Sequence, residues 1–150
     1  MNCFEVLSKD SFHIYEKEIS QLDLDCFPTS GWDLDQWLTL FQNYQLKVLL
    51  ALRDEKVLGF VAFSNIENES ELLKIGVKQA ERKLSLGSQL IKKMIDLLHN
   101  QNTDKVFLEV RSDNQNAIKL YSKYQFKLIN RRKNYYQNPL CDALIYRLEM

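Results

Sequence analysis

Between residues 71 and 121 the chain alternates between strand-like and helix-like patterns. An apolar run at residues 71–77 suits a strand, and the loop after it ends in Arg82-Lys-Leu-Ser-Leu-Gly87. An amphipathic helix is expected from about residue 87 to residue 100, then a strand at 106–110, then a helix that opens at Asn114. A strand, a helix and a strand in this order require a crossover, which favours parallel neighbours in one sheet. This segment therefore predicts an α/β fold with a mixed sheet.

The first half of the chain contributes two helices and a hairpin. Residues 3–7 suit a first strand, and apolar residues recur at helical spacing from Lys9 to Leu22. Asp33 can cap a second helix, whose apolar residues at helical spacing are Leu34, Trp37, Leu38 and Phe41. Residues 46–52 and 57–63 suit a hairpin, and a polar loop is expected at 65–70.

The C-terminal part completes the order β-α-α-β-β-β-α-β-α-β-β. Ser112-Asp-Asn-Gln115 matches a capping box for the fourth helix, which contains Ile118, Leu120 and Tyr121. Residues 126–135 and 143–148 suit a closing antiparallel pair of strands. No repeat or linker interrupts this order, so residues 1–150 are expected to form one domain with helices packed on the sheet.

The composition is that of an ordinary globular protein. Hydrophobic residues make up 45% of the chain and charged residues 27%, and 20 basic residues balance 20 acidic ones. This balance argues against a nucleic-acid-binding or membrane-surface protein. Because no signal peptide and no apolar run of about 18 residues is present, we expect a cytoplasmic protein without a membrane span.

Cysteine and histidine are too scattered to suggest a metal site. The three cysteines, Cys3, Cys26 and Cys141, form no CxxC pair, and the chain has only two histidines. We expect reduced thiols and no metal. Cys141 has no histidine nearby in sequence to activate it, so an acyl-cysteine route is not expected.

The loop before residue 87 has two properties that attract an anion. Unpaired backbone N–H groups open the helix, and the helix dipole adds partial positive charge. Glu109, on the next strand, shares a face with Phe107 and Arg111, near the carboxyl end where α/β sheets place ligands. Tyr121 follows on the next helix. An anion site beside a possible base and a possible acid suits group transfer from a phosphate-bearing carrier.

This order and these residues resemble the GCN5-related N-acetyltransferases. The coenzyme loop of that family has Gln or Arg, two residues, Gly, one residue, then Gly or Ala; here Arg82 and Gly87 match, but Ser85 replaces the first glycine. A Cβ at that position disfavours a positive φ angle and reduces the space for a diphosphate. We therefore expect weakened coenzyme binding at most.

The C-terminal third is similar to one group in this family, the bacterial N-terminal acetyltransferases of ribosomal proteins. The matching residues are Leu108-Glu-Val-Arg111, Asn114, Ala117-Ile-Lys-Leu-Tyr121, Phe126 and Asn134-Tyr-Tyr136. Gln125 replaces a glycine that usually precedes the phenylalanine. The resemblance runs from about residue 71 to the end, whereas residues 1–70 fit only in the order of their elements and in the Phe27-Pro28 turn.

The resemblance implies acetyl-CoA as the acetyl donor. Backbone N–H groups of the loop would hold the coenzyme diphosphate, and the preceding strand would splay from its parallel neighbour and pair with the pantetheine arm. The implied coenzyme-binding residues are Ile75, Gly76, Val77, Arg82, Lys83, Leu84, Ser85, Leu86, Gly87, Ser88 and Asn114.

The resemblance also implies the catalytic and acceptor-binding residues. Glu109 would take the proton of the incoming ammonium, directly or through water, and Tyr121 would protonate the departing thiolate. Tyr135 and Tyr136 resemble a tyrosine pair that clasps the first residues of a protein substrate. Because adjacent residues on a regular strand point to opposite faces, only one of the two is expected to reach a peptide.

The pKa of the acceptor favours a protein N-terminus without excluding lysine. An α-amino group with a pKa of about 8 costs roughly 0.8 kcal/mol to deprotonate at about pH 7.4, whereas a lysine costs roughly 4 kcal/mol. A single carboxylate is well matched to the smaller cost. The expected partners are therefore acetyl-CoA and a protein N-terminus, such as that of a ribosomal protein, with a small amine as the alternative.

Two other functions stay open. A small-molecule amine or antibiotic acetyltransferase would need an acidic pocket built by the first 70 residues, where Asp23, Asp25, Asp33 and Asp35 are expected to be solvated or to cap helices. A catalytically inactive acyl-CoA-binding module is the other, suggested by Ser85 and Gln125.

Each residue also has a structural alternative. The loop could be an ordinary connection, Gly76 a packing glycine, and Glu109 solvated or paired with Arg111. Tyr121 could pack in the core with Ile118, and Asn114 could only cap its helix. The tyrosine pair could only pack against an edge strand.

Overall fold

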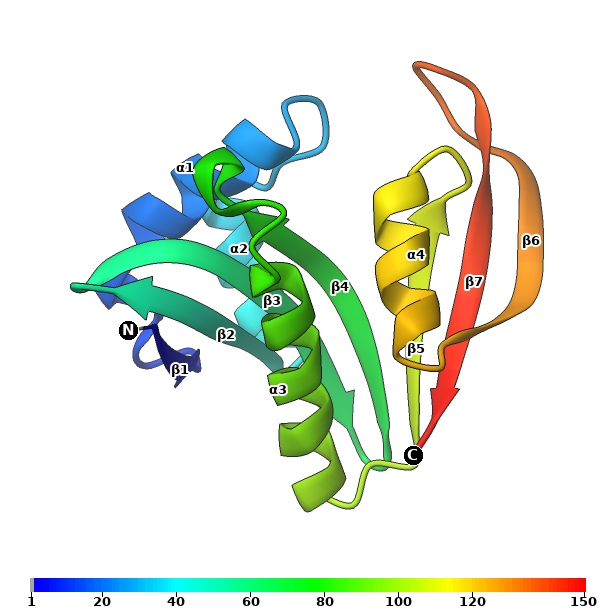
Figure 1. Cartoon of the computed structure of the whole chain (residues 1–150). Helices are drawn as coiled ribbons and strands as arrows, with labels where there is room; N and C mark the ends of the chain where they lie inside the picture. The colour runs from blue at the N-terminus through cyan, green and yellow to red at the C-terminus, as the bar shows by residue number, and fades with distance from the viewer. Residues whose placement is uncertain (1) are drawn as a thin grey trace.

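The computed structural model describes residues 2–150, which form one seven-stranded sheet with helices on both faces (Figure 1). The strands lie in the order β1-β2-β3-β4-β5-β7-β6, and every neighbouring pair is antiparallel except β4 and β5. The strands are β1 (Cys3–Leu7), β2 (Leu46–Arg53), β3 (Lys56–Ile66), β4 (Glu69–Val77), β5 (Lys105–Arg111), β6 (Lys127–Tyr136) and β7 (Cys141–Glu149). The helices are α1 (Glu16–Cys26), α2 (Leu34–Asn43), α3 (Leu86–Asn100) and α4 (Gln115–Lys123), with short 3-10 turns at Phe12–Ile14 and Gln79–Glu81. The predicted order of elements is confirmed.

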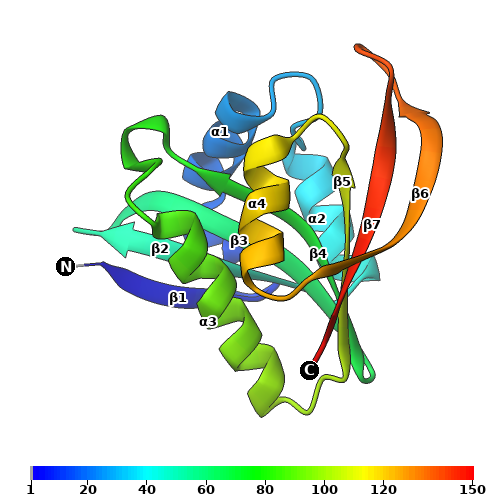
Figure 2. The same ribbon diagram turned by 45° about the vertical axis from the view of Figure 1, so that its right-hand side comes forward.

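Two hydrophobic clusters lie on the two faces of the sheet. One face, called here the α3–α4 face, packs Leu90, Met94 and Tyr121 against Leu108 and Val110 of β5. The opposite α1–α2 face packs Ile19 and Trp37 among a second cluster on β2 and β3. Figure 2 shows α3 and α4 crossing the same side of the sheet.

The parallel pair at the centre of the sheet is short. β4 and β5 pair only through Glu69–Leu72 and Lys105–Leu108, and beyond these residues the two strands diverge, as Figure 1 shows. Leu73 is an extra residue opposite β3, because Ala62 pairs with Lys74 while Phe63 pairs with Leu72. A bulge of this kind bends its strand and turns the following side chains. The free edge of β4 expected from the resemblance is therefore present.

Gly76 lies in the part of β4 that does not pair with β5, and close packing there leaves no room for a side chain. A Cβ at Gly76 would lie 2.7 Å from the Phe60 ring and 3.4 Å from the Cys26 sulfur. Any side chain would displace the Phe60 ring. The bulge itself lies at Leu73, three residues earlier.

A buried ion pair joins α1 to β4. The Lys74 ammonium donates to the Asp23 carboxylate at 2.8 Å and to the Ser30 carbonyl at 3.0 Å, and it lies 4.0 Å from the centre of the Trp32 ring. The same carboxylate accepts from the Trp32 backbone N–H. Burial lowers the pKa of Lys74 although Asp23 opposes this shift. The expectation that Asp23 is solvated or caps a helix was wrong, because its partner lies 51 residues away in sequence.

Some predicted boundaries were also wrong. The first helix begins at Glu16 and not at Lys9. The Ser8 N–H donates to the Ser11 hydroxyl, and a 3-10 turn follows at Phe12–Ile14. Tyr15 ends this turn with a non-helical φ of −121°. Residues 65–70 extend the ladder, pairing Asn65 with Ser70 around a tight turn. Strand pairing there overrides the polar composition.

The fourth helix is capped by Asn114 and lacks the predicted capping box at Ser112. Asn114 is the N-cap, and its side chain accepts from the Ala117 N–H at 3.2 Å. The predicted capping box at Ser112 is absent because the Ser112 backbone is still tied to the end of the sheet through Asp142. Asp33, in contrast, caps α2 as predicted, in a capping box with Gln36.

Candidate active site

The loop that opens α3 keeps the backbone geometry of a glycine-rich loop. Lys83 and Ser85 both have positive φ angles, 67° and 62°, and Ser85 is the N-cap of α3 without a side-chain cap. The first turn of α3 holds no acidic residue. Residues 82–85 are exposed, whereas Leu86 is buried. An exposed helix start without a carboxylate suits an anion such as a diphosphate.

A lysine from α4 lies at the same helix start. The Lys123 ammonium donates to the Ser88 hydroxyl at 3.1 Å, and the Tyr124 hydroxyl donates to the Ser88 carbonyl at 3.1 Å. These contacts bring positive charge from α4 to the first turn of α3. Sequence reasoning did not find Lys123, because nothing in the pattern of α4 shows that its last turn reaches another helix.

Arg82 is directed away from the loop. Its guanidinium donates to the Val77 carbonyl at 3.0 Å and to the Cys26 sulfur at 3.5 Å. Arg82 therefore braces the end of β4 against α1. Its charge remains near the free edge of β4, between Val77 and the loop.

Glu109 lies half-buried on the α1–α2 face of β5. Its neighbours Leu108 and Val110 are buried on the other face, as the alternation predicted. Glu109 lines a cavity of about 690 Å³ together with Phe107, Glu71, Arg132 and Ile145. The alternative that Arg111 pairs with Glu109 was wrong, because Arg111 pairs with Asp113 at 3.1 Å.

Tyr121 is buried on the α3–α4 face. Only 5% of its surface is exposed, and its ring centre lies 5.8 Å from that of Phe126. Burial raises the pKa of the Tyr121 phenol, which keeps it protonated at neutral pH. Tyr121 thus has the packing role given as its structural alternative, and it also retains a proton that it can donate. Glu109 and Tyr121 lie on opposite faces of the sheet.

The tyrosine pair lies at the end of β6. The rings of Tyr135 and Tyr136 pack edge to face with centres 5.1 Å apart. The expectation that they point to opposite faces was wrong, because pairing with β7 shifts after Arg132 and Asn134 has a φ of 54°. Burial, and then the charge of Glu109, raise the pKa of Tyr136. Tyr136 is therefore close enough to Glu109 to feel its charge.

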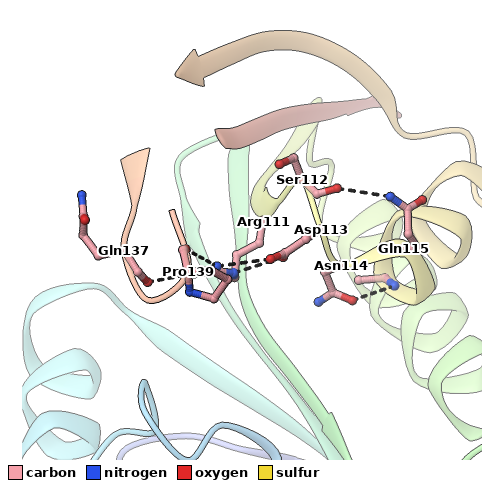
Figure 3. A network of polar contacts seen from close by, with 8 residues as sticks. Arg111, Ser112, Asp113, Asn114, Gln115, Gln137 and Pro139 are labelled. Carbon is pink, nitrogen blue, oxygen red and sulfur yellow. Dashed lines mark hydrogen bonds and ion pairs between the residues drawn. The ribbon is translucent and has the colours of Figure 1, made fainter. Parts of the chain in front are cut away.

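Arg111 holds the turn between β6 and β7 against the end of β5 (Figure 3). Its guanidinium donates to the Pro139 carbonyl at 2.8 Å and to the Gln137 carbonyl at 3.5 Å, and it lies 5.0 Å from the centre of the Tyr136 ring. The same guanidinium lowers the pKa of Asp113 through a hydrogen bond. Sequence reasoning missed this role, since the two carbonyls lie more than 25 residues further along the chain.

Asn114 uses its side-chain oxygen to cap α4, as its structural alternative proposed. Cys141 pairs with Tyr136 at the start of β7. Within residues 2–150, no group of three His, Cys, Asp or Glu side chains is arranged to hold a metal ion. No helix in the same residues is long and apolar enough to span a membrane.

Comparison with known protein families shows which family this chain belongs to. Residues 13–126 match the family described as Acetyltransferase (GNAT) family. The chain belongs to the GNAT acetyltransferase family. The enzyme class predicted from the sequence, an N-acetyltransferase, is confirmed.

The relatives of this acetyltransferase include N-terminal acetyltransferases. A Bacillus subtilis (strain 168) protein provisionally named ribosomal protein bS18-alanine N-acetyltransferase is 30% identical over 138 residues, 91% of this chain and 87% of the relative. An N-alpha-acetyltransferase of Saccharolobus solfataricus is 30% identical over 108 residues, 63% of this chain and 65% of the relative.

Solved structures show the same fold. The ribosomal-protein-S18-alanine N-acetyltransferase of Escherichia coli superposes with a TM-score of 0.88 at 23% identity, covering 99% of this acetyltransferase and 94% of that chain. Arabidopsis thaliana NAA60, solved in complex with acetyl-CoA, has a TM-score of 0.81 at 18% identity and covers 100% and 99% of the two chains.

Proposed function

We propose that this GNAT acetyltransferase moves the acetyl group of acetyl-CoA to the N-terminal α-amine of a protein, by direct transfer in a ternary complex. The observation that carries the proposal is the gap between β4 and β5. The strands part just beyond Leu72 and Leu108, with Glu109 on one face and Tyr121 on the other. An acyl group in this gap could be reached by a base and by an acid from opposite sides.

The residues around the gap fit the coenzyme. The exposed start of α3, from Arg82 to Ser88, can hold the diphosphate, and Lys123 adds a cation beside it. The unpaired edge of β4 at Ile75, Gly76 and Val77 can pair with the amides of the pantetheine arm. The coenzyme would supply an activated acetyl thioester. The Asn114 side chain caps α4. We therefore propose that Asn114 contacts the pantetheine arm only where the arm passes the start of this helix.

In the proposed chemistry, one proton transfer takes place on each face of the sheet. Glu109 takes a proton from the acceptor ammonium, directly or through water, because only the neutral amine has a lone pair for attack. Tyr121 gives its phenolic proton to the sulfur that leaves. Its raised pKa keeps the phenol protonated until negative charge develops on the leaving sulfur. Because a thiolate is a weaker base than a phenolate, the phenol first stabilises that charge with a hydrogen bond, and the second proton that the acceptor nitrogen loses replaces the one passed to sulfur.

Two observations favour a protein N-terminus as acceptor. Tyr135 and Tyr136 pack against each other, the charge of Glu109 acts on Tyr136, and Arg111 fixes the turn that follows them. Such a tyrosine pair can hold the first residues of an extended peptide. The names of the relatives point the same way, since the Bacillus subtilis and Saccharolobus solfataricus proteins are named as N-terminal acetyltransferases.

A small polycationic amine is the second candidate. The cavity beside Glu109 is lined by five carboxylates and two cations, and the carboxylates are Glu67, Glu69, Glu71, Asp104 and Glu109. This excess of negative charge would attract a polyamine as well as a protein N-terminus.

Calorimetry and thiol release test both candidates. Titration of the protein with acetyl-CoA should give saturable binding, and release of the coenzyme thiol should then be followed with an Ala-starting peptide, spermidine and a blocked lysine peptide. The proposal expects turnover that is fastest with the Ala-starting peptide. Turnover with spermidine alone would support the second candidate, and binding without turnover on any acceptor would support an inactive acyl-CoA-binding module.

A further inference from the structure

The bulge at Leu73 turns the Lys74 side chain to the α1–α2 face of the sheet. Leu72 packs in the cluster on the α3–α4 face, and regular alternation would return Lys74 to that face two residues later. Because Leu73 is an extra residue, Lys74 pairs instead with Ala62, which belongs to the cluster on the α1–α2 face. Only 9% of the Lys74 surface is exposed, and its ammonium contacts the segment that joins α1 to α2, called here the α1–α2 loop (residues 27–33).

The Lys74 ammonium contacts the α1–α2 loop at three points. It donates to the Ser30 carbonyl at 3.0 Å, and it lies 4.8 Å and 4.0 Å from the ring centres of Phe27 and Trp32. Its partner carboxylate, Asp23, accepts from the Trp32 backbone N–H at 2.9 Å. One cation and one carboxylate therefore tie the start, the middle and the end of the loop to β4.

The α1–α2 loop begins at the free edge of β4. The thiol of Cys26, the last residue of α1, donates to the Val77 carbonyl at 3.5 Å, and its sulfur lies 3.4 Å from the position of a Cβ on Gly76. The loop and the turn between β6 and β7 lie at the same end of the molecule, and Figure 1 shows the β4–β5 gap between them (Figure 1 and Figure 2). The loop is on the face of the sheet that carries Glu109. It therefore borders the gap on the side from which the acceptor is proposed to approach.

The tip of the loop depends on this anchor for its position. Pro28-Thr-Ser30 is exposed, so burial of apolar surface does little to fix it. The N–H groups of Ser30 and Gly31 donate to the Phe27 carbonyl, which closes the turn but does not attach it to the sheet. A mobile loop loses conformational entropy when a ligand binds against it, whereas a loop held in place before binding avoids that cost.

We propose that Lys74 is a positioning residue for the acceptor: together with Asp23 it holds the α1–α2 loop in place as one wall of the acceptor entrance. This proposal rests on the proposed function. Lys74 acts through the loop and does not contact the acceptor or the acetyl group. Because the loop lies on the α1–α2 face and α3 packs on the other face, loss of the anchor weakens acceptor binding and leaves coenzyme binding unchanged.

The double substitution Asp23→Leu/Lys74→Met tests this role, because it removes the anchor without leaving a buried charge unpaired. Replacement of a buried ion pair by apolar side chains of similar size is often neutral for stability, so the midpoint of urea unfolding should stay close to that of the wild type. The KM for the Ala-starting peptide should rise about tenfold, whereas kcat and the KM for acetyl-CoA should stay within about twofold. Lys74→Arg keeps a cation that can donate to the Asp23 carboxylate and the Ser30 carbonyl, and its peptide KM should stay within about threefold of the wild type.

Fluorescence of Trp32 reports the position of the loop without any turnover. The chain has two tryptophans, and Trp37 is fully buried, so acrylamide quenches mainly Trp32. Quenching should increase about twofold in the double variant, because the loop leaves the sheet. In the wild type, a tryptophan-free Ala-starting peptide added with coenzyme A, which carries no acetyl group to transfer, should reduce quenching because the peptide covers the loop.

The matched control is Lys92→Met/Asp96→Leu. These two substitutions remove an ion pair on the exposed side of α3. The control should match the wild type in urea unfolding, in both KM values and in acrylamide quenching.

The outcomes separate the two proposals. If the wild type acetylates the peptide, an unchanged peptide KM in the double variant, or an equal rise in the KM values for peptide and acetyl-CoA, would overturn the role of Lys74 alone. Equal quenching of wild-type Trp32 with and without the peptide would do the same, and this measurement needs no variant. A wild-type protein that neither binds acetyl-CoA in the calorimeter nor acetylates the peptide would overturn the proposed function, and the role of Lys74 with it.

Discussion

Ser85 shows what a single residue changes in the loop proposed to bind the coenzyme. Glycine is the usual residue for a positive φ, yet Ser85 adopts 62° and still begins α3. A side chain in this conformation costs roughly 1–2 kcal/mol, whereas the extra freedom of an unfolded glycine costs roughly 0.5–1 kcal/mol. The replacement of the family's glycine by Ser85 therefore changes the stability of the protein more than it changes the backbone geometry of the loop.

Ser85→Gly should stabilise the protein by about 0.5–1 kcal/mol, measured by urea unfolding. Binding of acetyl-CoA should be equal or tighter, since the Cβ is removed beside the proposed diphosphate. Ser122→Gly within α4 is the control and should destabilise by about 0.5 kcal/mol. Equal losses of stability in both variants would show that the loop is not strained.

Glu109→Gln tests the base. The rate should fall by about 10²–10⁴-fold at neutral pH, and it should keep rising as the α-amine itself loses its proton near pH 8. Binding of acetyl-CoA should remain close to that of the wild type. An unchanged pH profile in this variant would reject Glu109 as the base.

At the scale of elements, long-range contacts join segments whose local patterns do not reveal them. The periodicity of apolar residues predicted the four helices, because each helix buries one face. The bulge at Leu73 depends on the partner strand, and the Asp23–Lys74 pair joins residues far apart in sequence. Neither leaves a local signal.

Lys74→Met should cost about 3–5 kcal/mol of unfolding free energy, because it leaves the fully buried Asp23 without its cation. Urea denaturation measures this loss. Lys92→Met is the matched control, since Lys92 pairs with Asp96 on the exposed side of α3 and should matter by at most about 0.5 kcal/mol. Similar small losses in both variants would mean that the α1–β4 pair does not stabilise the fold.

Arg111→Lys should loosen the turn between β6 and β7. A lysine cannot donate to two carbonyls and a carboxylate with one planar group, so Tyr136 loses its support. The KM for a peptide acceptor should rise about fivefold to tenfold, and the KM for acetyl-CoA should not change. Arg53→Lys, which alters a contact to Glu81 elsewhere, is the control. A larger effect on acetyl-CoA than on the peptide would contradict this role of Arg111.

At the scale of the whole molecule, the sheet separates two functions. The residues proposed to bind the coenzyme gather at the start of α3 and the end of α4, whereas Glu109 and Glu71 line the cavity on the other side of the sheet. The α/β fold and the family could be predicted because their signals are local. The geometry of the tyrosine pair could not, because it depends on the register between β6 and β7.

The central claim is that an acetyl group passes through the β4–β5 gap to a protein N-terminus. It is tested most directly by incubating the protein with acetyl-CoA and an Ala-starting peptide that also carries an internal lysine, then locating the acetyl group by mass spectrometry. We predict one acetyl group on the α-amine and none on the lysine, lost in Glu109→Gln. Acetylation of the lysine alone, or of neither amine, would contradict the account.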